Sequence, residues 1–174
     1  MSETAPTPTR KRNWTIYLLA GLVLAAGAGF AGWQLFAPKA STTVDQSLMM
    51  SSSSEPVAVR SGTLSGADRF HNVEGTVTVF RDGGAYFLRF EDYDATSGPD
   101  VYFYLTPSAN AGSASEVENE GLRVLVPGGA SGGQATLRGN FNVPLPADFD
   151  ATMYNGLVVW CDRFNVEFGR AMLA

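Results

Sequence analysis

The sequence predicts an all-β domain, a small antiparallel β-sandwich or barrel, preceded by one N-terminal transmembrane helix. Residues 57–174 contain many short β-prone runs separated by turn residues, and no stretch of ten residues there has helical periodicity. Before them, residues 14–36 form an uncharged apolar run. Many short strands at turn spacing are typical of sandwiches and barrels, and about 115 residues are enough to bury one core.

The apolar run over residues 14–36 is long enough to cross a bilayer, which requires about 20 residues in a helix. Its aromatic residues lie near both ends, where their rings favour the membrane interface. Residues 10–12 are all basic, whereas Lys39 alone follows shortly after the run. The positive-inside rule therefore predicts a single-pass cell-membrane protein with residues 1–13 in the cytoplasm. The C-terminal domain would be extracytoplasmic, in the periplasm or outside the cell.

A cleavable signal peptide is the alternative. Its apolar region would be about 7–15 residues long and would end at a small-x-small site. Ala26-Gly27-Ala28 is a candidate for that site. The apolar run continues beyond it to Phe36, however, and Pro38 disfavours a later site, so the sequence favours an uncleaved anchor. Both alternatives export the domain.

The segment after the span and the charge of the domain limit the partners. Residues 37–56 are rich in Ser and Thr and lack periodicity, which predicts a flexible linker. From residue 60 onward the chain has eight arginines, no lysine, and fourteen aspartates and glutamates. An acidic surface repels phosphate backbones, which argues against nucleic acid as a partner.

The chain's single cysteine forms no internal disulfide, although an exported domain lies in an oxidising compartment.

Runs of apolar residues, several in clean alternation with polar ones, predict the strands of the exported domain over residues 57–174. They are expected at residues 57–64, 76–80, 85–90, 101–105, 122–126, 134–138, 141–144, 157–161 and 164–168. The second and third form a β-hairpin around residues 81–84, whose two glycines can adopt positive φ. Residues 108–121 are small, acidic and without pattern, and we expect a mobile surface loop there.

The stretch over residues 157–168 contains the only cysteine. Residues 157–161 are nearly all apolar and predict a strand buried on both faces, and a second strand is expected after a tight corner at Asp162-Arg163. Cys161 therefore lies at the end of a core strand, where the chain turns. Its thiolate would be the soft ligand or redox-active nucleophile of the chain. A buried cysteine that only fills space is the alternative.

His71 is the only histidine, and imidazole with the Cys161 thiolate is a ligand pair for a transition metal or haem. Two ligands do not complete a closed metal site, which takes four, so others would come from Asp100, Met153 or water. We therefore predict no dedicated metal site. A hydrogen-bonded structural histidine is the alternative. The absence of a Cys-x-x-Cys-His motif excludes covalent c-type haem.

Other motifs do not assign an enzymatic activity. Asp92, Asp94 and Asp100 lack EF-hand spacing and favour a solvated turn over a calcium site. The turn at residues 98–100 would enter the aromatic strand, with the Asp100 side chain bonded to nearby backbone N–H groups. Residues 128–133 are glycine-rich but lack the Lys-Ser/Thr ending of a phosphate loop. No Gly-x-Ser-x-Gly elbow accompanies the single histidine.

Particular residues of the exported domain form a recognisable set. They are Gly62, Leu64, Phe70, His71, Val73, Gly75 and Phe90, then residues 98–105 (Gly-Pro-Asp-Val-Tyr-Phe-Tyr-Leu), Gly139, Phe141 and Pro144, and finally residues 158–161 (Val-Val-Trp-Cys), Phe164, Val166, Phe168, Ala171 and Leu173. With these marks, residues 60–174 resemble the DM-thirteen domain, a small extracytoplasmic β domain found alone in bacteria and beside DOMON domains in animal surface proteins. Phe141 departs from the family, which commonly has a tyrosine there.

The resemblance implies a role in electron transfer to or from a redox partner protein. In that role Cys161 would be a bare thiol or would hold a prosthetic group such as haem. His71, a candidate from the residues and not from the resemblance, would be a second cofactor ligand. The alternative is a non-catalytic cell-surface binding or adhesion module in which Cys161 is a buried structural residue. A membrane anchor, a linker and a compact β domain fit both functions.

Overall fold

The computed structural model describes residues 17–18, 22–23, 29, 42–51, 55–125 and 137–174. Residues 1–37 and 38–174 are two separate units, and each is described by itself. The described residues within the predicted span 14–36 are helical, and the rest of that span and residues 1–13 lie outside the described part. No helix among the described residues is long and apolar enough to cross a membrane.

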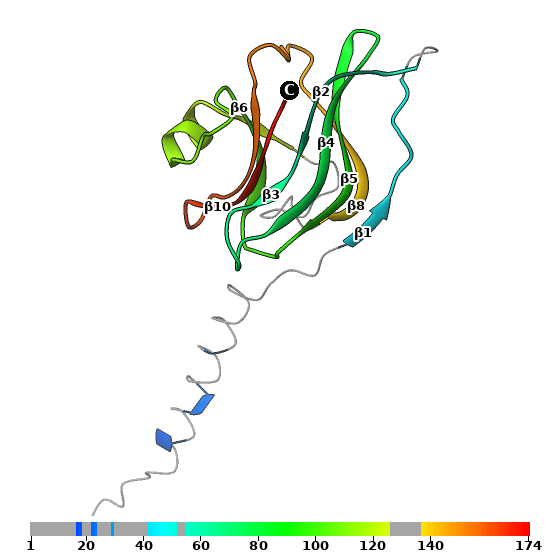
Figure 1. Cartoon of the computed structure of the whole chain (residues 1–174). Coiled ribbons are helices and arrows are strands. Elements are labelled where there is room, and N and C mark those ends of the chain that lie inside the picture. The colour runs from blue at the N-terminus through cyan, green and yellow to red at the C-terminus, as the bar shows by residue number, and fades with distance from the viewer. Residues whose placement is uncertain (1–16, 19–21, 24–28, 30–41, 52–54, 126–136) are drawn as a thin grey trace, which may run out of the picture. The chain divides into compact units, whose positions relative to one another are not determined.

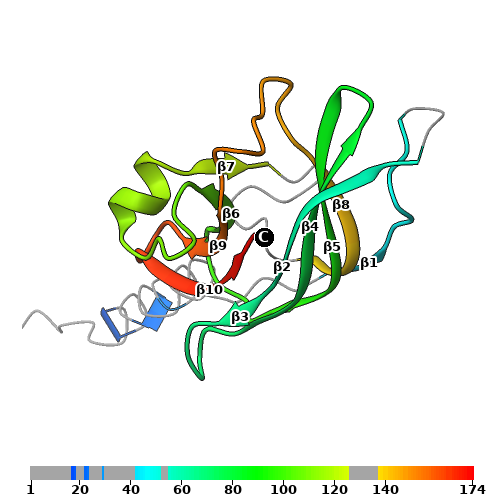
Figure 2. The ribbon, with the colours of Figure 1, turned by 45° about the horizontal axis from the view of Figure 1, so that its top comes forward.

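Two five-stranded sheets form the second unit (Figures 1 and 2). The first sheet has the order β1 (Thr42–Asp45), β8 (Leu137–Pro144), β5 (Ala85–Ala95), β4 (Val73–Asp82) and β2 (Val57–Thr63). The second has the order β3 (Ser65–Gly66), β10 (Val166–Met172), β9 (Gly156–Cys161), β6 (Val101–Thr106) and β7 (Leu122–Val124). Neighbouring strands are antiparallel, except for the parallel pair β1 and β8. The all-β prediction is confirmed.

The core lies between the two sheets. Phe90 of the first sheet stacks on Phe103 of the second, with ring centroids 4.6 Å apart. Inward side chains of β9, including Val159 and Cys161, belong to the same buried cluster. The alternation of β4 and β5 places Val77, Val79, Leu88 and Phe90 on this inner face. The turn between the two strands contains Gly83 at a φ of 61°, as the sequence predicts.

The outer face of the second sheet is covered by residues 107–121. A short helical turn, η1 (Ser115–Asn119), places Val117 against this face, where it is fully buried. A second apolar cluster results, made of Tyr102, Tyr104, Ala111, Val117, Val158 and Trp160. β9 is thus buried on both faces, as predicted. The expectation of a mobile loop at residues 108–121 is wrong, because single apolar residues in an irregular segment can dock without any periodic pattern.

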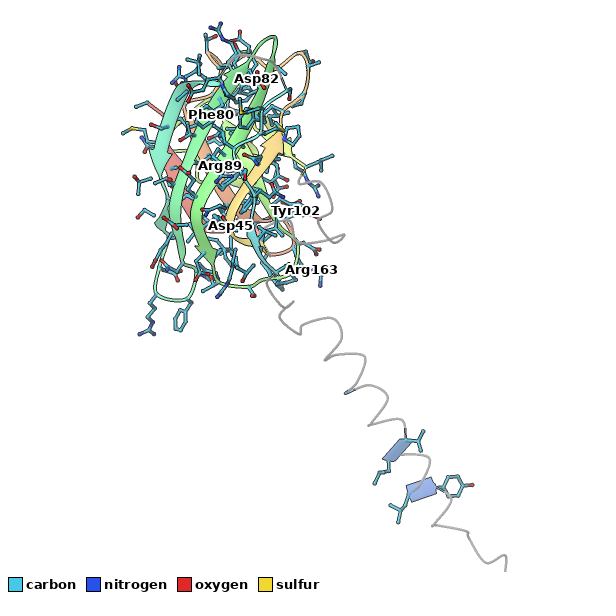
Figure 3. All side chains as sticks on the ribbon, turned by 90° about the vertical axis from the view of Figure 1, so that its right-hand side faces the viewer. Asp45, Phe80, Asp82, Arg89, Tyr102 and Arg163 are labelled. Carbon is cyan, nitrogen blue, oxygen red and sulfur yellow. The ribbon has the colours of Figure 1, made fainter. Side chains whose placement is uncertain are left out.

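The predicted flexible linker, residues 37–56, contains a paired strand. β1 lies in its middle, and the backbone N–H of Gln46 donates to the Asn140 carbonyl at 2.8 Å. Arg89 is only 7 % exposed, and its Nη1 donates to the Gln46 carbonyl at 2.6 Å. Figure 3 shows Arg89 and Asp45 on the same sheet. A buried guanidinium requires acceptors, and the Gln46 carbonyl of this segment is one.

The turn between β9 and β10 is longer than the predicted corner at Asp162-Arg163. It occupies residues 162–165, and β10 begins at Val166 instead of Phe164. Asn165 adopts a positive φ of 52°, a conformation that Asn tolerates and that completes the turn. Phe164 therefore belongs to the turn and is 54 % exposed.

Candidate functional site

Cys161 is the last residue of β9, and 1 % of it is exposed. The strand register places it opposite Val101 of β6 on one side and Val166 of β10 on the other. Its Sγ donates a hydrogen bond to the carbonyl oxygen of Pro99 at 3.0 Å. The thiol thus lies at one end of the sandwich, against the turn that leads into β6.

Burial raises the pKa of the Cys161 thiol, because an apolar environment disfavours the thiolate. Backbone N–H groups of Phe164 and Arg163 bond to the sulfur and lower the pKa, whereas the carboxylates of Asp100 and Asp162 raise it. The result is a thiol that keeps its proton at neutral pH. In the sequence, Asp162 would raise the pKa of the Cys161 thiol and Arg163 would lower it, so the neighbouring charges do not decide the direction of the shift. The structure shows that burial has the largest effect on this pKa.

An ion pair joins the turn over residues 98–100 to the β9–β10 turn. Arg163 Nε and Nη2 each lie 2.7 Å from Asp100 Oδ2. The backbone N–H of Asp162 donates to the Asp100 carbonyl at 3.0 Å, and Asp100 has a positive φ of 52°. The predicted turn is present. The Asp100 carboxylate, however, pairs with Arg163 where backbone N–H groups were expected.

His71 lies in the loop between β3 and β4. Its Nδ1 is 2.9 Å from Asp68 Oδ2, while Asp68 Oδ1 accepts the backbone N–H groups of Phe70 at 2.7 Å and His71 at 2.8 Å. The His71 side chain, followed by these backbone groups, lowers the pKa of Asp68 to about 2. The imidazole also meets the Phe168 ring edge-on, with centroids 4.8 Å apart. Because Nδ1 is engaged, Nε2 is the nitrogen that remains for a ligand.

One mainly apolar pocket, with a volume of about 310 Å³, has both Cys161 and His71 on its wall. It is lined by Phe70, His71, Ser97, Gly98, Pro99, Cys161, Phe164, Val166 and Phe168. Gly98 allows the backbone before β6 to approach the Phe168 ring closely, since a Cβ at position 98 would lie 2.6 Å from Phe168 Cζ. The two predicted site residues, 90 positions apart in the numbering, are thus neighbours of one cavity. Their chemical roles stay predictions.

Comparison with protein-family models identifies the domain that carries this pocket. The model described as Electron transfer DM13 matches residues 65–173. The chain belongs to the Electron transfer DM13 family. This confirms the resemblance predicted from the sequence for residues 60–174. A search of curated proteins and a search of solved structures found no match.

The residues of this DM13 domain do not fit a closed metal site. Among the described residues, no three His, Cys, Asp or Glu side chains gather closely enough to hold a metal ion. Asp100 is paired with Arg163, and Met153 is 59 % exposed and does not line the pocket. Cys161 and His71, one sulfur and one imidazole, share the largely apolar wall of the pocket.

Four residues of the DM13 pocket region were not predicted as site residues, although Phe70, Pro99 and Phe164 are among the marks of the family resemblance. They are Asp68, Phe70, Pro99 and Phe164. Three of them left a signal, because the tripeptide Asp-Arg-Phe occurs twice, at residues 68–70 and 162–164. Pro99 acts through its carbonyl oxygen, and every residue type has such an oxygen, so its contact with the thiol had no signal in the sequence.

Proposed function

We propose that this DM13 protein is a membrane-anchored, extracytoplasmic electron-transfer protein whose redox site is the pocket shared by Cys161 and His71. Electrons would pass between this site and a redox partner protein. One observation carries the proposal: the only thiol and the only imidazole of the chain line the same pocket. Membership of a family described by electron transfer supports it.

A bound haem or transition-metal ion would supply a one-electron couple here, with Cys161 and His71 as the side chains that hold it. Cys161 must lose its proton to become a ligand. The backbone N–H groups of Arg163 and Phe164 then stabilise the negative charge on the sulfur. Because the pKa of the free thiol is raised, loading of such a group becomes more favourable as the pH rises.

Asp68 would position the imidazole of His71. Its carboxylate holds Nδ1 at 2.9 Å and its other oxygen holds the loop backbone, so the ring orientation is set before any ligand binds. Phe168 supports the same ring from the side. A carboxylate hydrogen-bonded to a ligating imidazole also increases the basicity of that imidazole.

Membrane anchoring is supported by the uncharged run over residues 14–36 and by the basic residues before it. The full chain should remain with the membrane fraction after an alkaline carbonate wash. A protease added on the outer side of the membrane should digest residues 57–174 and leave the N-terminus protected. Release by carbonate, or protection of the domain, would contradict this part of the proposal.

Absorption spectroscopy and metal analysis of the purified full chain test the redox site. The unaltered protein should show visible absorbance from a bound group. Cys161→Ser and His71→Ala should both abolish that absorbance if the two side chains hold the group. Met153→Leu is the matched control, because Met153 is a potential ligand type that lies outside the pocket, and it should leave the spectrum unchanged.

A bare redox thiol would leave the purified protein colourless, but Cys161 would then react with a thiol probe in the folded state. The burial and the hydrogen bond of this thiol favour a second candidate function, a non-catalytic binding module with a structural cysteine. A colourless protein whose thiol reacts only after unfolding would support that function and contradict electron transfer. Cys161→Ser would then alter stability alone.

A further inference from the structure

Two loops at one end of the sandwich carry the same tripeptide and an exposed aromatic residue. Asp68-Arg69-Phe70 precedes β4, and Asp162-Arg163-Phe164 lies in the turn between β9 and β10. Phe70 is 65 % exposed and Phe164 is 54 % exposed, and both line the mainly apolar pocket. Exposed aromatic rings at the mouth of an apolar hollow are unfavourable in water and indicate a contact surface.

The strand register shows that the chain enters the sandwich at this same end. β1 begins at Thr42, beside the start of β8, and β8 begins beside the end of β5. The end of β5 lies beside Val73, the first residue of β4, and the loop with Phe70 directly precedes Val73. Figure 3 shows Arg163 at this end and Asp82, in the β4–β5 hairpin, at the opposite end.

Only residues 37–41 separate the predicted span from β1. A fully extended chain covers at most about 3.5 Å per residue, so this connection is at most about 20 Å long. If residues 14–36 span a bilayer, the start of β1 therefore lies within about that distance of the end of the span.

The charges of the two loops suit a lipid interface. Asp68 is paired with His71, and Arg163 with Asp100, which reduces the cost of removing these groups from water. The Arg69 guanidinium lies 4.4 Å from the Phe70 ring centroid, so the charge can stay among headgroups while the ring goes deeper. Because the rest of the domain is acidic, a zwitterionic surface fits better than an anionic one.

We propose that the pocket end of the sandwich is a membrane-contact surface, in which Phe70 and Phe164 enter the interface of a phosphatidylcholine-like bilayer. The contact rests on the proposed membrane anchoring and is independent of the redox chemistry of Cys161. It directs the mouth of the pocket toward the lipid headgroups. A ligand or partner of the pocket would then have to approach along the membrane surface.

Spin labelling of the full chain in phosphatidylcholine vesicles tests this contact. Cys161→Ser removes the native thiol, and single labels are attached through Ser97→Cys, at the pocket rim, or Gly84→Cys, in the β4–β5 turn. Both positions are exposed, and a Cβ at Gly84 meets no other atom within 4 Å. Vesicle-bound protein is isolated by flotation. The measured quantity is the accessibility of each label to oxygen relative to a water-soluble nickel complex.

We expect this ratio to be several-fold higher at position 97 than at position 84. Replacing both Phe70 and Phe164 by Ser should reduce the ratio at position 97 to the value at position 84. The matched control replaces Met153 and Met172 by Ser, two side chains that are 59 % and 67 % exposed. They lie near Gly156, at the other end of β9 from Cys161, so their replacement should leave the ratio unchanged.

If the ratios at positions 97 and 84 are equal and match that of a label in water, the proposal is overturned. Phe70 and Phe164 would then be contacts for a protein or a small ligand. A high ratio at position 97 that survives the loss of both phenylalanines would overturn it as well. If the chain does not float with the vesicles, both the proposed membrane anchoring and the proposed contact are contradicted. Because the protein tested lacks Cys161, a failed redox site would leave the result standing.

Discussion

Arg163 places its Nε and Nη2 2.7 Å from the same carboxylate oxygen of Asp100, across 63 positions of sequence. The pair joins the turn that leads into β6 to the turn that follows β9. Beside it, the sulfur of Cys161 donates to the Pro99 carbonyl at 3.0 Å. Two polar links therefore join residues 99–100 to the end of β9 and the turn after it, and they hold the thiol against the pocket wall.

Arg163→Ala should loosen these two turns. We expect a loss of unfolding free energy of about 0.5 kcal/mol, since both partners are partly exposed and solvent screens the pair. We also expect faster labelling of Cys161 by a maleimide in the folded state. Arg138→Ala is the control, because it removes an ion pair with Asp94 in the first sheet. Arg138→Ala should lower the unfolding free energy in urea by a similar amount without changing the labelling rate of Cys161. Equal labelling rates in the Arg163→Ala and Arg138→Ala variants would contradict this role of Arg163.

The raised pKa of Cys161 predicts a stability change at alkaline pH. The unfolded thiol ionises near pH 8.5, whereas the folded thiol ionises at higher pH. The unfolded chain therefore gains stability from ionisation first, and the unfolding free energy should fall as the pH rises from about 8.5 through the folded pKa. Tyr93 and Tyr104 also have raised pKa values and add a fall at still higher pH.

Cys161→Ser separates the contribution of the thiol from that of the tyrosines. Unfolding in urea is measured at intervals from pH 7 to about pH 11, past the ordinary tyrosine pKa of about 10, for both proteins. The variant should lose the first part of the decline and keep the later part. Identical slopes in the two proteins would show that the thiol does not titrate differently in the folded state.

Glu118 should stabilise the segment that covers the second sheet. Trp160 is 2 % exposed, and its indole N–H donates to Glu118 Oε1 at 2.8 Å. Glu118→Ala leaves this donor unpaired, and we expect a loss of about 1–2 kcal/mol in urea unfolding. Glu120→Ala, which removes an exposed charge from the same segment, should stay within about 0.5 kcal/mol. Equal effects of the two substitutions would contradict the docked position of residues 107–121.

Hydrogen exchange should distinguish the paired strand β1 from a flexible linker. The amide of Gln46 donates to the Asn140 carbonyl, and the carbonyl of Gln46 accepts from buried Arg89. We therefore expect the Gln46 amide to exchange more slowly than an unstructured peptide of the same sequence. Arg89→Ala should increase its exchange rate. Exchange at the unstructured rate in the unaltered protein would restore the linker prediction.

Local pattern was sufficient for elements with a regular pattern of their own. The β4–β5 hairpin follows from alternating residues around two glycines, and β9 follows from an apolar run although its neighbour β6 is distant in sequence. β1 could not be predicted in this way. It pairs with β8, and Arg89 and Asn142 bond to Gln46 directly after it. These partners lie more than 40 positions away and leave no periodicity in a Ser/Thr-rich segment.

By itself, the sequence determined the all-β class, the family and the two site candidates, because alternation, motif residues and the uniqueness of Cys161 and His71 are properties of the chain alone. Only the tertiary structure decided that these two residues line one pocket, that Asp68 orients the imidazole, and that burial raises the thiol pKa. Desolvation and hydrogen bonding depend on which atoms surround a group. Those atoms come from the loops before β4 and β6 and from the turn after β9, which only folding brings to the same end of the sandwich.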